Sequence, residues 1–252
     1  MTIRFSCTAC GRCCHGLRLL LSAEEARVWA LRGGLVQILV HAAPAVNDDD
    51  EVARYKRERR FIARSGELAI RVQVMLVARF EGACPNLLPD MRCGIYNERP
   101  TVCRIYPAEI IPGMALNVGN RLCPPEAWSN SQPPFLLEDG YVTDDVTRGA
   151  ITKSRATALT DVPTLQLLVQ SLGIDVVALE NEGFAVWTIA SDRLIEALDA
   201  ASSHTTGSLE ETSPYTWRFL SLRPDTATLI SSVGADVIGA SPHEDLTYIP
   251  LY

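Results

Sequence analysis

Eight cysteines are the residues of this chain with the clearest chemistry, and four of them share one short loop. The loop reads C-x2-C-x2-C-C over Cys7, Cys10, Cys13 and Cys14, with Gly11 inside it. Two-residue spacings let neighbouring thiolates converge on one point, as in structural zinc sites and in iron–sulfur sites. A glycine permits the tight backbone turns that such a loop needs. The loop is therefore a candidate metal site.

The other four cysteines lie far along the chain from this loop. They are Cys84, Cys93, Cys103 and Cys123. The first three loop cysteines have the spacing of a bacterial ferredoxin, in which a remote cysteine followed by proline completes a cluster. Cys84-Pro85 and Cys123-Pro124 both fit that description. We expect all eight cysteines to be metal ligands, and we place an iron–sulfur cluster of four irons ahead of zinc.

Several alternatives for these thiols stay open on the sequence. A disulfide framework would also use an even number of cysteines. The N-terminal residues do not resemble a signal peptide, so we expect a cytoplasmic protein whose thiols stay reduced. His15 could supply a zinc ligand or cap the loop. The cysteines could form two four-thiolate sites, one site with spare thiols, or one larger cluster.

Charge and cysteine content both divide the chain at Cys123. Residues 1–123 hold every cysteine and a net charge of +5, whereas residues 124–252 hold no cysteine and a net charge of −12. We expect a cysteine-cluster metal-binding region over residues 1–123, a Pro-rich connector over 124–134 and an acidic region over 135–252. The acidic region is expected to meet a protein partner or substrate.

Overall composition excludes two classes of partner. The net charge of −7 argues against a surface built to neutralise nucleic-acid phosphates. No uncharged apolar stretch approaches the 18 residues that a membrane-spanning helix needs. We therefore expect no nucleic acid and no membrane among the partners.

Arginines and tyrosines close to the cysteines are candidates for supporting roles at the metal. The arginines are Arg12, Arg92, Arg99 and Arg104. Their charge could offset the negative charge that four thiolates leave around a metal, although the chain is rich in arginine throughout. Tyr96 and Tyr106 could donate hydrogen bonds to sulfur or simply pack over the site. We name Arg99, Arg104, Tyr96 and Tyr106 as cofactor-binding candidates.

Residues 84–107 form a second cysteine block, C-P-N-L-L-P-D-M-R-C-G-I-Y-N-E-R-P-T-V-C-R-I-Y-P. Together with F-S-C-T-A-C-G-R-C-C at 5–14, this block resembles the CxxCxxCC cysteine-cluster family of zinc- or iron-chelating proteins. The matching positions are Cys7, Cys10, Cys13, Cys14, Cys84-Pro85, Leu87, Cys93, Ile95-Tyr96, Arg99-Pro100, Cys103-Arg104 and Tyr106-Pro107. The resemblance covers about residues 5–107 and implies a chelated metal.

Flagellin lysine-N-methylases look similar in the same cysteine block, so the resemblance also implies a possible enzyme with an iron–sulfur site. The chain lacks a glycine-rich loop after a clear strand, the C-x3-C-x2-C loop of radical enzymes, H-E-x-x-H and a nucleophile elbow. No residue set demands catalysis. A third hypothesis is a protein that passes zinc or iron on to another site.

Local patterns predict an α+β fold: a cysteine-rich, loop-rich metal-binding half followed by a smaller α+β or α/β unit. Ser22 and Glu25 predict a capping box that opens a helix, which Gly33-Gly34 ends. Residues 68–80 predict a strand leading into Cys84. In the second half we expect helices over 162–172, 191–201 and 225–233, and strands over 184–189 and 216–222. Pro163 is expected in the first turn of the helix over 162–172.

Two charged features each have two interpretations. The basic run over residues 54–64 could contact an anionic partner or the acidic half, or it could be a solvated helix face. The acidic pairs Asp144-Asp145 and Glu210-Glu211 could bind a cation, or they could be solvated surface.

Overall fold

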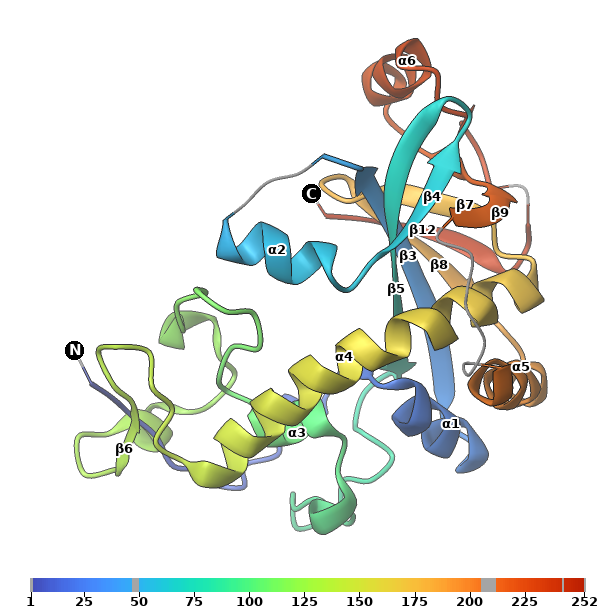
Figure 1. Cartoon of the computed structure of the whole chain (residues 1–252). Helices are drawn as coiled ribbons and strands as arrows, with labels where there is room; N and C mark the ends of the chain where they lie inside the picture. The colour runs from blue at the N-terminus through green and yellow to red at the C-terminus, as the bar shows by residue number, and fades with distance from the viewer. Residues whose placement is uncertain (1, 47–49, 205–211, 242, 252) are drawn as a thin grey trace.

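The computed structural model describes residues 2–46, 50–204, 212–241 and 243–251 (Figure 1). Within these residues ten strands form one mixed sheet. They are β2 Arg18–Leu21, β3 Leu35–Pro44, β4 Phe61–Ser65, β5 Leu68–Arg79, β7 Val176–Leu179, β8 Gly183–Thr188, β9 Thr212–Thr216, β10 Arg218–Leu220, β11 Val237–Ile238 and β12 Leu246–Pro250. The main path runs β11-β10-β7-β3-β5-β4-β9, with β2 on β5 and with β8 on β3 and β12.

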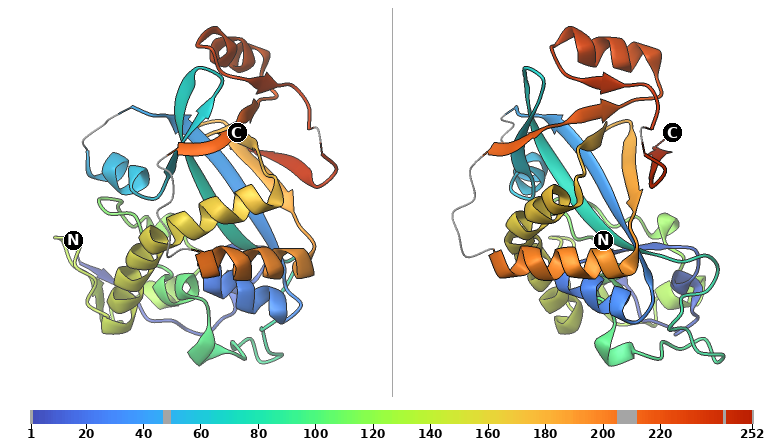
Figure 2. Two further views of the ribbon diagram at one scale, coloured as in Figure 1. Left: turned by 45° about the vertical axis from the view of Figure 1, so that its right-hand side comes forward. Right: turned by 90° about the vertical axis from the view of Figure 1, so that its right-hand side faces the viewer.

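Three of the described helices cover one face of this sheet. The described helices are α1 Ala23–Leu31, α2 Glu51–Arg57, α3 Thr101–Ile105, α4 Asp145–Leu172, α5 Ser191–His204 and α6 Pro224–Ser232. Figure 2 shows α1, α4 and α5 side by side in front of the strands. Their apolar side chains join those of the strands in one buried core, which includes Trp29, Leu168 and Leu198. The combination confirms an α+β fold.

The sheet is shared by both halves of the chain. Strand β3, from the cysteine-bearing half, pairs parallel with β7 and antiparallel with β8, which both come from the acidic half. The same strand pairs with β5 along its whole length, from Leu35↔Arg79 to Pro44↔Ile70. The boundary at residue 123 therefore marks a change in charge and cysteine content, and the sheet crosses it.

Several predicted elements are confirmed with nearly the expected limits. Helix α1 has the capping box, because Ser22 accepts from the Glu25 backbone N–H and Glu25 accepts from the Ser22 backbone N–H. Strand β5 occupies Leu68–Arg79, close to the predicted 68–80. Strand β8 and helices α5 and α6 also lie where the pattern places them. The predicted strand over 216–222 is divided between β9 and β10.

The prediction of a helix over 162–172 is wrong in extent, because α4 begins at Asp145. Asp144 caps the helix by accepting from the Thr147 backbone N–H at 2.7 Å. Pro163 lies inside the helix instead of in its first turn. An internal proline costs one backbone hydrogen bond, and here the packing of the apolar face outweighs that cost. Buried Leu168 and Val169 belong to that face.

A second, smaller apolar cluster packs the segment after Cys123 against α3 and α4. It contains the buried side chains of Ile105, Phe135, Val142, Ala150 and Ile151. Strand β6, Pro134–Leu136, pairs with β1, Ile3–Arg4, so the N-terminal residues are held at the same place. This cluster and the end of the sheet together frame the cysteine loops. No helix in the described part of the chain is long and apolar enough to cross a membrane.

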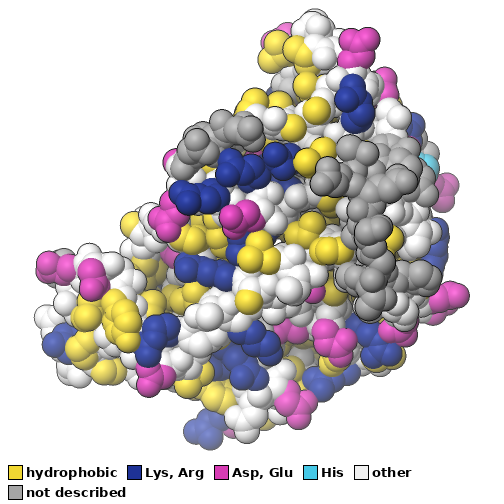
Figure 3. Space-filling model, in the orientation of Figure 1, with side chains coloured by type: hydrophobic (Ala, Val, Ile, Leu, Met, Phe, Trp, Pro, Cys, Tyr) yellow, Lys and Arg dark blue, Asp and Glu magenta, His cyan; other side chains and the backbone are white. Residues whose placement is uncertain are grey.

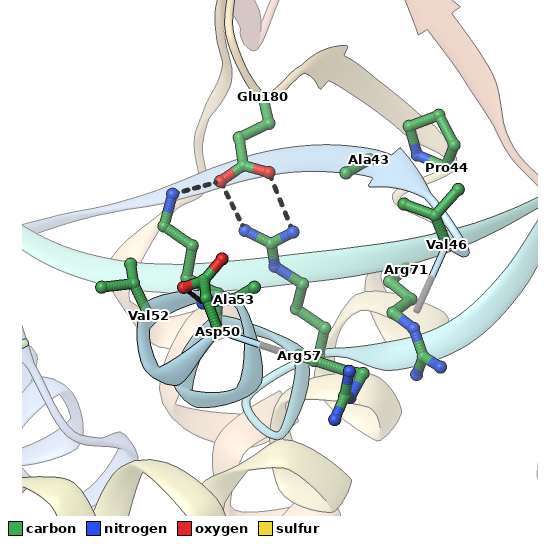
Figure 4. A pocket seen from close by; sticks show the side chains of 11 residues that line it. Ala43, Pro44, Val46, Asp50, Val52, Ala53, Arg57, Arg71 and Glu180 are labelled. Carbon is green, nitrogen blue, oxygen red and sulfur yellow. Dashed lines mark hydrogen bonds and ion pairs between the residues drawn. The ribbon is translucent and has the colours of Figure 1, made fainter. Parts of the chain in front are cut away.

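The basic run over residues 54–64 contacts the acidic half of the chain. Lys56 Nζ and the Arg60 guanidinium both donate to the Glu180 carboxylate, at 3.0 Å and at 2.7 Å. Figure 4 shows these bonds inside a pocket of about 380 Å³ beside α2. The Arg60 side chain is only 6% exposed, so this part of the run is not a solvated face. Other Lys and Arg side chains gather on the surface over α2 (Figure 3).

The Glu180 contact predicts a pH dependence of stability. Burial alone would raise the pKa of Glu180, but hydrogen bonds and charges from Arg60 and Lys56 outweigh it and lower the pKa to about 2. The contact therefore stabilises the fold fully above the ordinary carboxyl value of 4.5, and the contribution is lost as the pH falls toward 2. We expect Glu180→Gln to lower the free energy of unfolding at pH 7 by roughly 2 kcal/mol, because Arg60 is left buried without its partner.

Urea unfolding at pH 7 and at pH 3 measures this effect, and the difference between wild type and Glu180→Gln should shrink at pH 3. Glu58→Gln is the matched control, because Glu58 is an exposed carboxylate that follows the same helix. Its effect should stay below about 0.5 kcal/mol. A Glu180→Gln difference that is independent of pH would contradict the account.

Candidate metal centre

The sheet places the first cysteine loop beside the second. Strands β2 and β5 pair antiparallel with Arg18 opposite Arg79, so the chain before β2 and the chain after β5 leave the sheet together. The pairing resumes at the bridge between His15 and Ala83. The Cys84 backbone N–H then donates to the Cys14 carbonyl at 2.7 Å. Cys14 and Cys84, distant in the sequence, are thus neighbours in the fold.

The residues after Cys84 fold back as a short irregular hairpin. Leu87 and Cys93 form a bridge, and the Gly94 N–H donates to the Asn86 carbonyl at 2.8 Å. The hairpin brings Cys93 back toward Cys84. Gly11, at φ 66°, lies against this hairpin, since a Cβ there would meet Met91 Cε at 2.7 Å and the Met91 carbonyl oxygen at 3.2 Å. The two cysteine loops therefore pack on each other through the glycine.

Helix α3 brings Cys103 to the same region. Glu25 Oε1 accepts from the backbone N–H of Thr101 at 2.7 Å and from its hydroxyl at 2.6 Å. The carboxylate that completes the α1 capping box therefore also holds the start of α3. Cys103 and Cys84 both pack, partly buried, against the main apolar core.

Cys123 reaches the first loop from the other side. The Ser6 N–H donates to the Ala127 carbonyl at 3.0 Å, which joins the chain just before Cys7 to the chain just after Cys123. The Tyr106 hydroxyl accepts from the Leu122 N–H at 2.7 Å. Tyr106 is also hydrogen-bonded to the Cys123 thiol. Tyr106 therefore fixes the position of Cys123.

Seven of the eight cysteines line one cavity of about 890 Å³. They are Cys7, Cys10, Cys13, Cys14, Cys93, Cys103 and Cys123. None of the eight cysteines forms a disulfide. Cys7 is exposed, and the other seven are half-buried. Within the described residues, no three Cys, His, Asp or Glu side chains are grouped so as to hold a single metal ion. The thiols surround a space instead of one point.

Comparison with known families agrees with this arrangement. Residues 6–124 match the model of the CxxCxxCC family, described as a "Putative zinc- or iron-chelating domain". This match to the CxxCxxCC family covers just under half of the chain. The match starts just before Cys7 and ends just after Cys123, so the CxxCxxCC domain contains every cysteine of the chain. Neither the curated proteins nor the solved structures contain a match to this chain.

Burial keeps the thiols of Cys13, Cys14 and Cys103 neutral when no cation is near. It raises the pKa of Cys103 to about 12, and the thiols of Cys14, Cys84 and Cys93 add to the effect. Burial also raises the pKa of Cys14 to about 12 and that of Cys13 to about 11. Thiolates in this environment need a nearby cation to be stable. A thiophilic metal supplies that charge.

Arg99 is placed to serve bound thiolates. Its charge favours the thiolate form of Cys103, and its Nε is buried without a hydrogen-bond partner. The guanidinium carbon lies 4.0 Å from the centre of the Tyr96 ring, and both residues line the cavity. An unsatisfied buried N–H beside a thiol fits an anionic metal–thiolate group, because that N–H can donate to sulfur. The residues present therefore fit a chelated metal.

The other candidates named from the sequence lie around the same cavity. Arg104 lines it, but it donates to the backbone carbonyls of Arg99 and Asn97 and so braces the turn before α3. Tyr106 lines it beside Cys123, and burial raises its pKa to about 12. Arg92 is on the lining and largely exposed. Arg12 is exposed as well.

Several residues of the site are not found by sequence reasoning. Arg121 lies near Cys123 and favours its thiolate form. Thr147, in the first turn of α4, also lines the cavity, and so does the N-cap Asp144, which the sequence singles out only as part of an acidic pair. The capping pattern at Asp144 could have located that helix start. Nothing in the sequence indicates that Met91 packs on Gly11.

Local geometry bears on two open alternatives. His15 Nδ1 donates to the Gly11 carbonyl at 3.0 Å, so this nitrogen braces the first loop and only Nε2 is left as a metal ligand. Asp144 caps α4 and Asp145 pairs with Arg148, so both acids have structural partners. Glu210 and Glu211 lie outside the described residues.

The contact between the cysteine loops can be tested at Gly11. Gly11→Ala should lower both the melting temperature and the amount of metal bound, because the new Cβ pushes on Met91 in a left-handed backbone conformation. We expect a loss of about 2–4 kcal/mol in the free energy of unfolding. Thermal unfolding and elemental analysis of the purified protein measure the two effects.

Gly16→Ala is the control for this substitution. Gly16 also has positive φ, at 60°, but no heavy atom lies within 4 Å of its added Cβ. It should cost only about 1–2 kcal/mol of backbone strain and leave the metal content unchanged. Equal losses in the two variants would show that the loop contact contributes nothing.

Proposed function

We propose that the CxxCxxCC domain holds an iron–sulfur cluster of the four-iron type in the cysteine-lined cavity. The observation that carries the proposal is the convergence of thiols from separate segments on one cavity of about 890 Å³. The segments are the first loop, the hairpin after β5, helix α3 and the chain around Cys123.

The size and lining of the cavity favour a cluster over zinc. A structural zinc ion binds four thiolates at about 2.3 Å in a closed tetrahedron, which leaves no cavity between the sulfurs. The thiolates of an iron–sulfur cluster bind different irons, so they stand around a group of atoms that fills space. Four thiols can serve such a cluster without meeting at the position of one ion. The ferredoxin-like spacing of Cys7, Cys10 and Cys13 supports the same choice.

Local charge and burial support retention of an anionic cluster. Four thiolates around an oxidised four-iron cluster leave a net charge of about −2. Arg99 and Arg121 lie close enough to two of the thiols to favour their ionised form. Tyr106, hydrogen-bonded at Cys123, and the Arg99–Tyr96 pair would limit access of water to the cluster. Solvent access and nearby donors set the potential of such clusters.

We extend the proposal to the setting of the protein. Eight unpaired thiols persist in a reducing compartment, which supports the cytoplasm as the location. The acidic half carries a net charge of −12, and a basic protein surface is the partner or substrate that such a charge would attract.

Elemental analysis of the anaerobically purified full-length protein tests the cluster. Iron and acid-labile sulfide should be present in equal amounts, and the sample should be brown with broad absorbance in the visible range. Expression in iron-supplemented and in zinc-supplemented medium is the control for adventitious loading. A colourless protein with stoichiometric zinc under both conditions would contradict the cluster.

A further inference from the structure

We propose that the pocket beside α2 binds the oxyanion group, a phosphate or a carboxylate, of a small molecule, with Arg71 as its main contact. The pocket and the cysteine-lined cavity have no lining residue in common. The inference is therefore independent of the metal centre and of the function proposed for it.

The fold places this pocket at the carboxyl ends of two parallel strands. Strands β3 and β7 pair in parallel with Ala42 opposite Leu179, and the Glu180 N–H donates to the Ala42 carbonyl at 2.9 Å. Ala43, Pro44 and Glu180 follow this pairing directly and line the pocket. The crevice outside the carboxyl ends of parallel strands is where open sheets commonly bind their ligands. The position of the pocket is thus that of a ligand site.

Arg71 enters the pocket from strand β5. It stands directly opposite Ala43 in the antiparallel pair of β3 and β5, so both side chains lie on the same face of the sheet. The neighbouring Ile70 and Val72 point to the other face and belong to the main apolar core, together with side chains of α1, α4 and α5. Arg71 therefore lies on the face of the sheet that those three helices do not cover.

The charge of Arg71 has no partner in the described part of the protein. Its half-buried side chain forms no hydrogen bond and no ion pair with any described residue, and its Nε is buried without an acceptor. Figure 4 shows its guanidinium on the side of the pocket away from Glu180. A partly desolvated guanidinium that lacks a partner costs stability, and a phosphate or carboxylate group matches its planar set of donors.

The other charges that line the pocket leave cations in surplus. Lys56 and Arg60 share one carboxylate, because Arg60 donates to both oxygens of Glu180, at 2.9 Å and 2.7 Å, and Lys56 donates to one of them at 3.0 Å. Asp50, the second carboxylate on the lining, accepts from the Ala53 backbone N–H at 2.9 Å and so caps α2. Lys56 is 42% exposed and has further protons to donate. A bound anion is favoured by this balance.

The size and the remaining lining of the pocket define the kind of ligand. A volume of about 380 Å³ is at the lower end of the range for small-molecule sites. The uncharged part of the lining consists of small apolar side chains, namely Ala43, Pro44, Val46, Val52 and Ala53. A compact molecule with one oxyanion and an apolar body therefore fits.

Calorimetric titration of the purified full-length protein with phenyl phosphate and with benzoate tests the inference. At least one of these probes should bind saturably at one site per chain, and the one that binds more tightly identifies the ligand as a phosphate or a carboxylate. Arg71→Gln should weaken that binding about tenfold or more, because charged hydrogen bonds to the ligand are lost. Arg71→Lys keeps the charge without the paired donors and should weaken binding to a smaller extent.

Arg64→Gln is the matched control. Arg64 belongs to the same basic run and is exposed, but it donates to the Glu67 carbonyl at 2.8 Å and does not line the pocket. Its loss should change the dissociation constant by no more than about twofold, since exposed charges are screened. Circular dichroism checks that each variant is folded, and Arg71→Lys decides the question if Arg71→Gln is not. Absence of saturable binding of both probes to the wild type, or equal weakening by the Arg71 and Arg64 variants, would overturn the inference.

Discussion

The antiparallel pairing of β2 with β5 is the constraint on which the metal centre depends. The pairing that sets Arg18 opposite Arg79 is followed, after a shift of one residue, by the His15–Ala83 bridge and the backbone bond between Cys14 and Cys84. A shift of one residue in a strand pair moves every side chain to the other face of the sheet. The buried Leu19, Leu21, Leu76 and Ala78 oppose such a shift, because it would expose them. The apolar core of the sheet thus fixes the relative position of two cysteine loops that it does not contain.

Away from the sheet, the cysteine region has little apolar support of its own. Its second core is a small cluster around Ile105 and Phe135, and the loops between are irregular. Small loop-rich regions that lack a large core are commonly stabilised by metal or disulfides. Because the eight cysteines form no disulfide, a bound metal is the stabiliser available to these loops. Binding and local folding are therefore expected to be coupled in the CxxCxxCC domain.

Local signals in the sequence predicted local structure well. Ser22 and Glu25 locate the start of α1, and alternating apolar residues locate β5, because capping and alternation act between near neighbours. Strand β3 was not predicted, since it is buried on both faces and its apolar run shows no alternation. The length of α4 was missed because Pro163 suggested a helix start. The cysteine spacing pointed to the candidate ligands, but the contact of Cys14 with Cys84 depends on strand register, which no local pattern encodes.

The central claim is that cysteine thiolates from distant segments bind the metal together. X-ray absorption at the edge of whichever metal the anaerobically purified full-length protein contains measures its ligands directly. We expect a coordination shell made of sulfur alone, with about four sulfurs per metal atom and, for an iron–sulfur cluster, a second shell of neighbouring iron. A shell dominated by nitrogen or oxygen would contradict the claim.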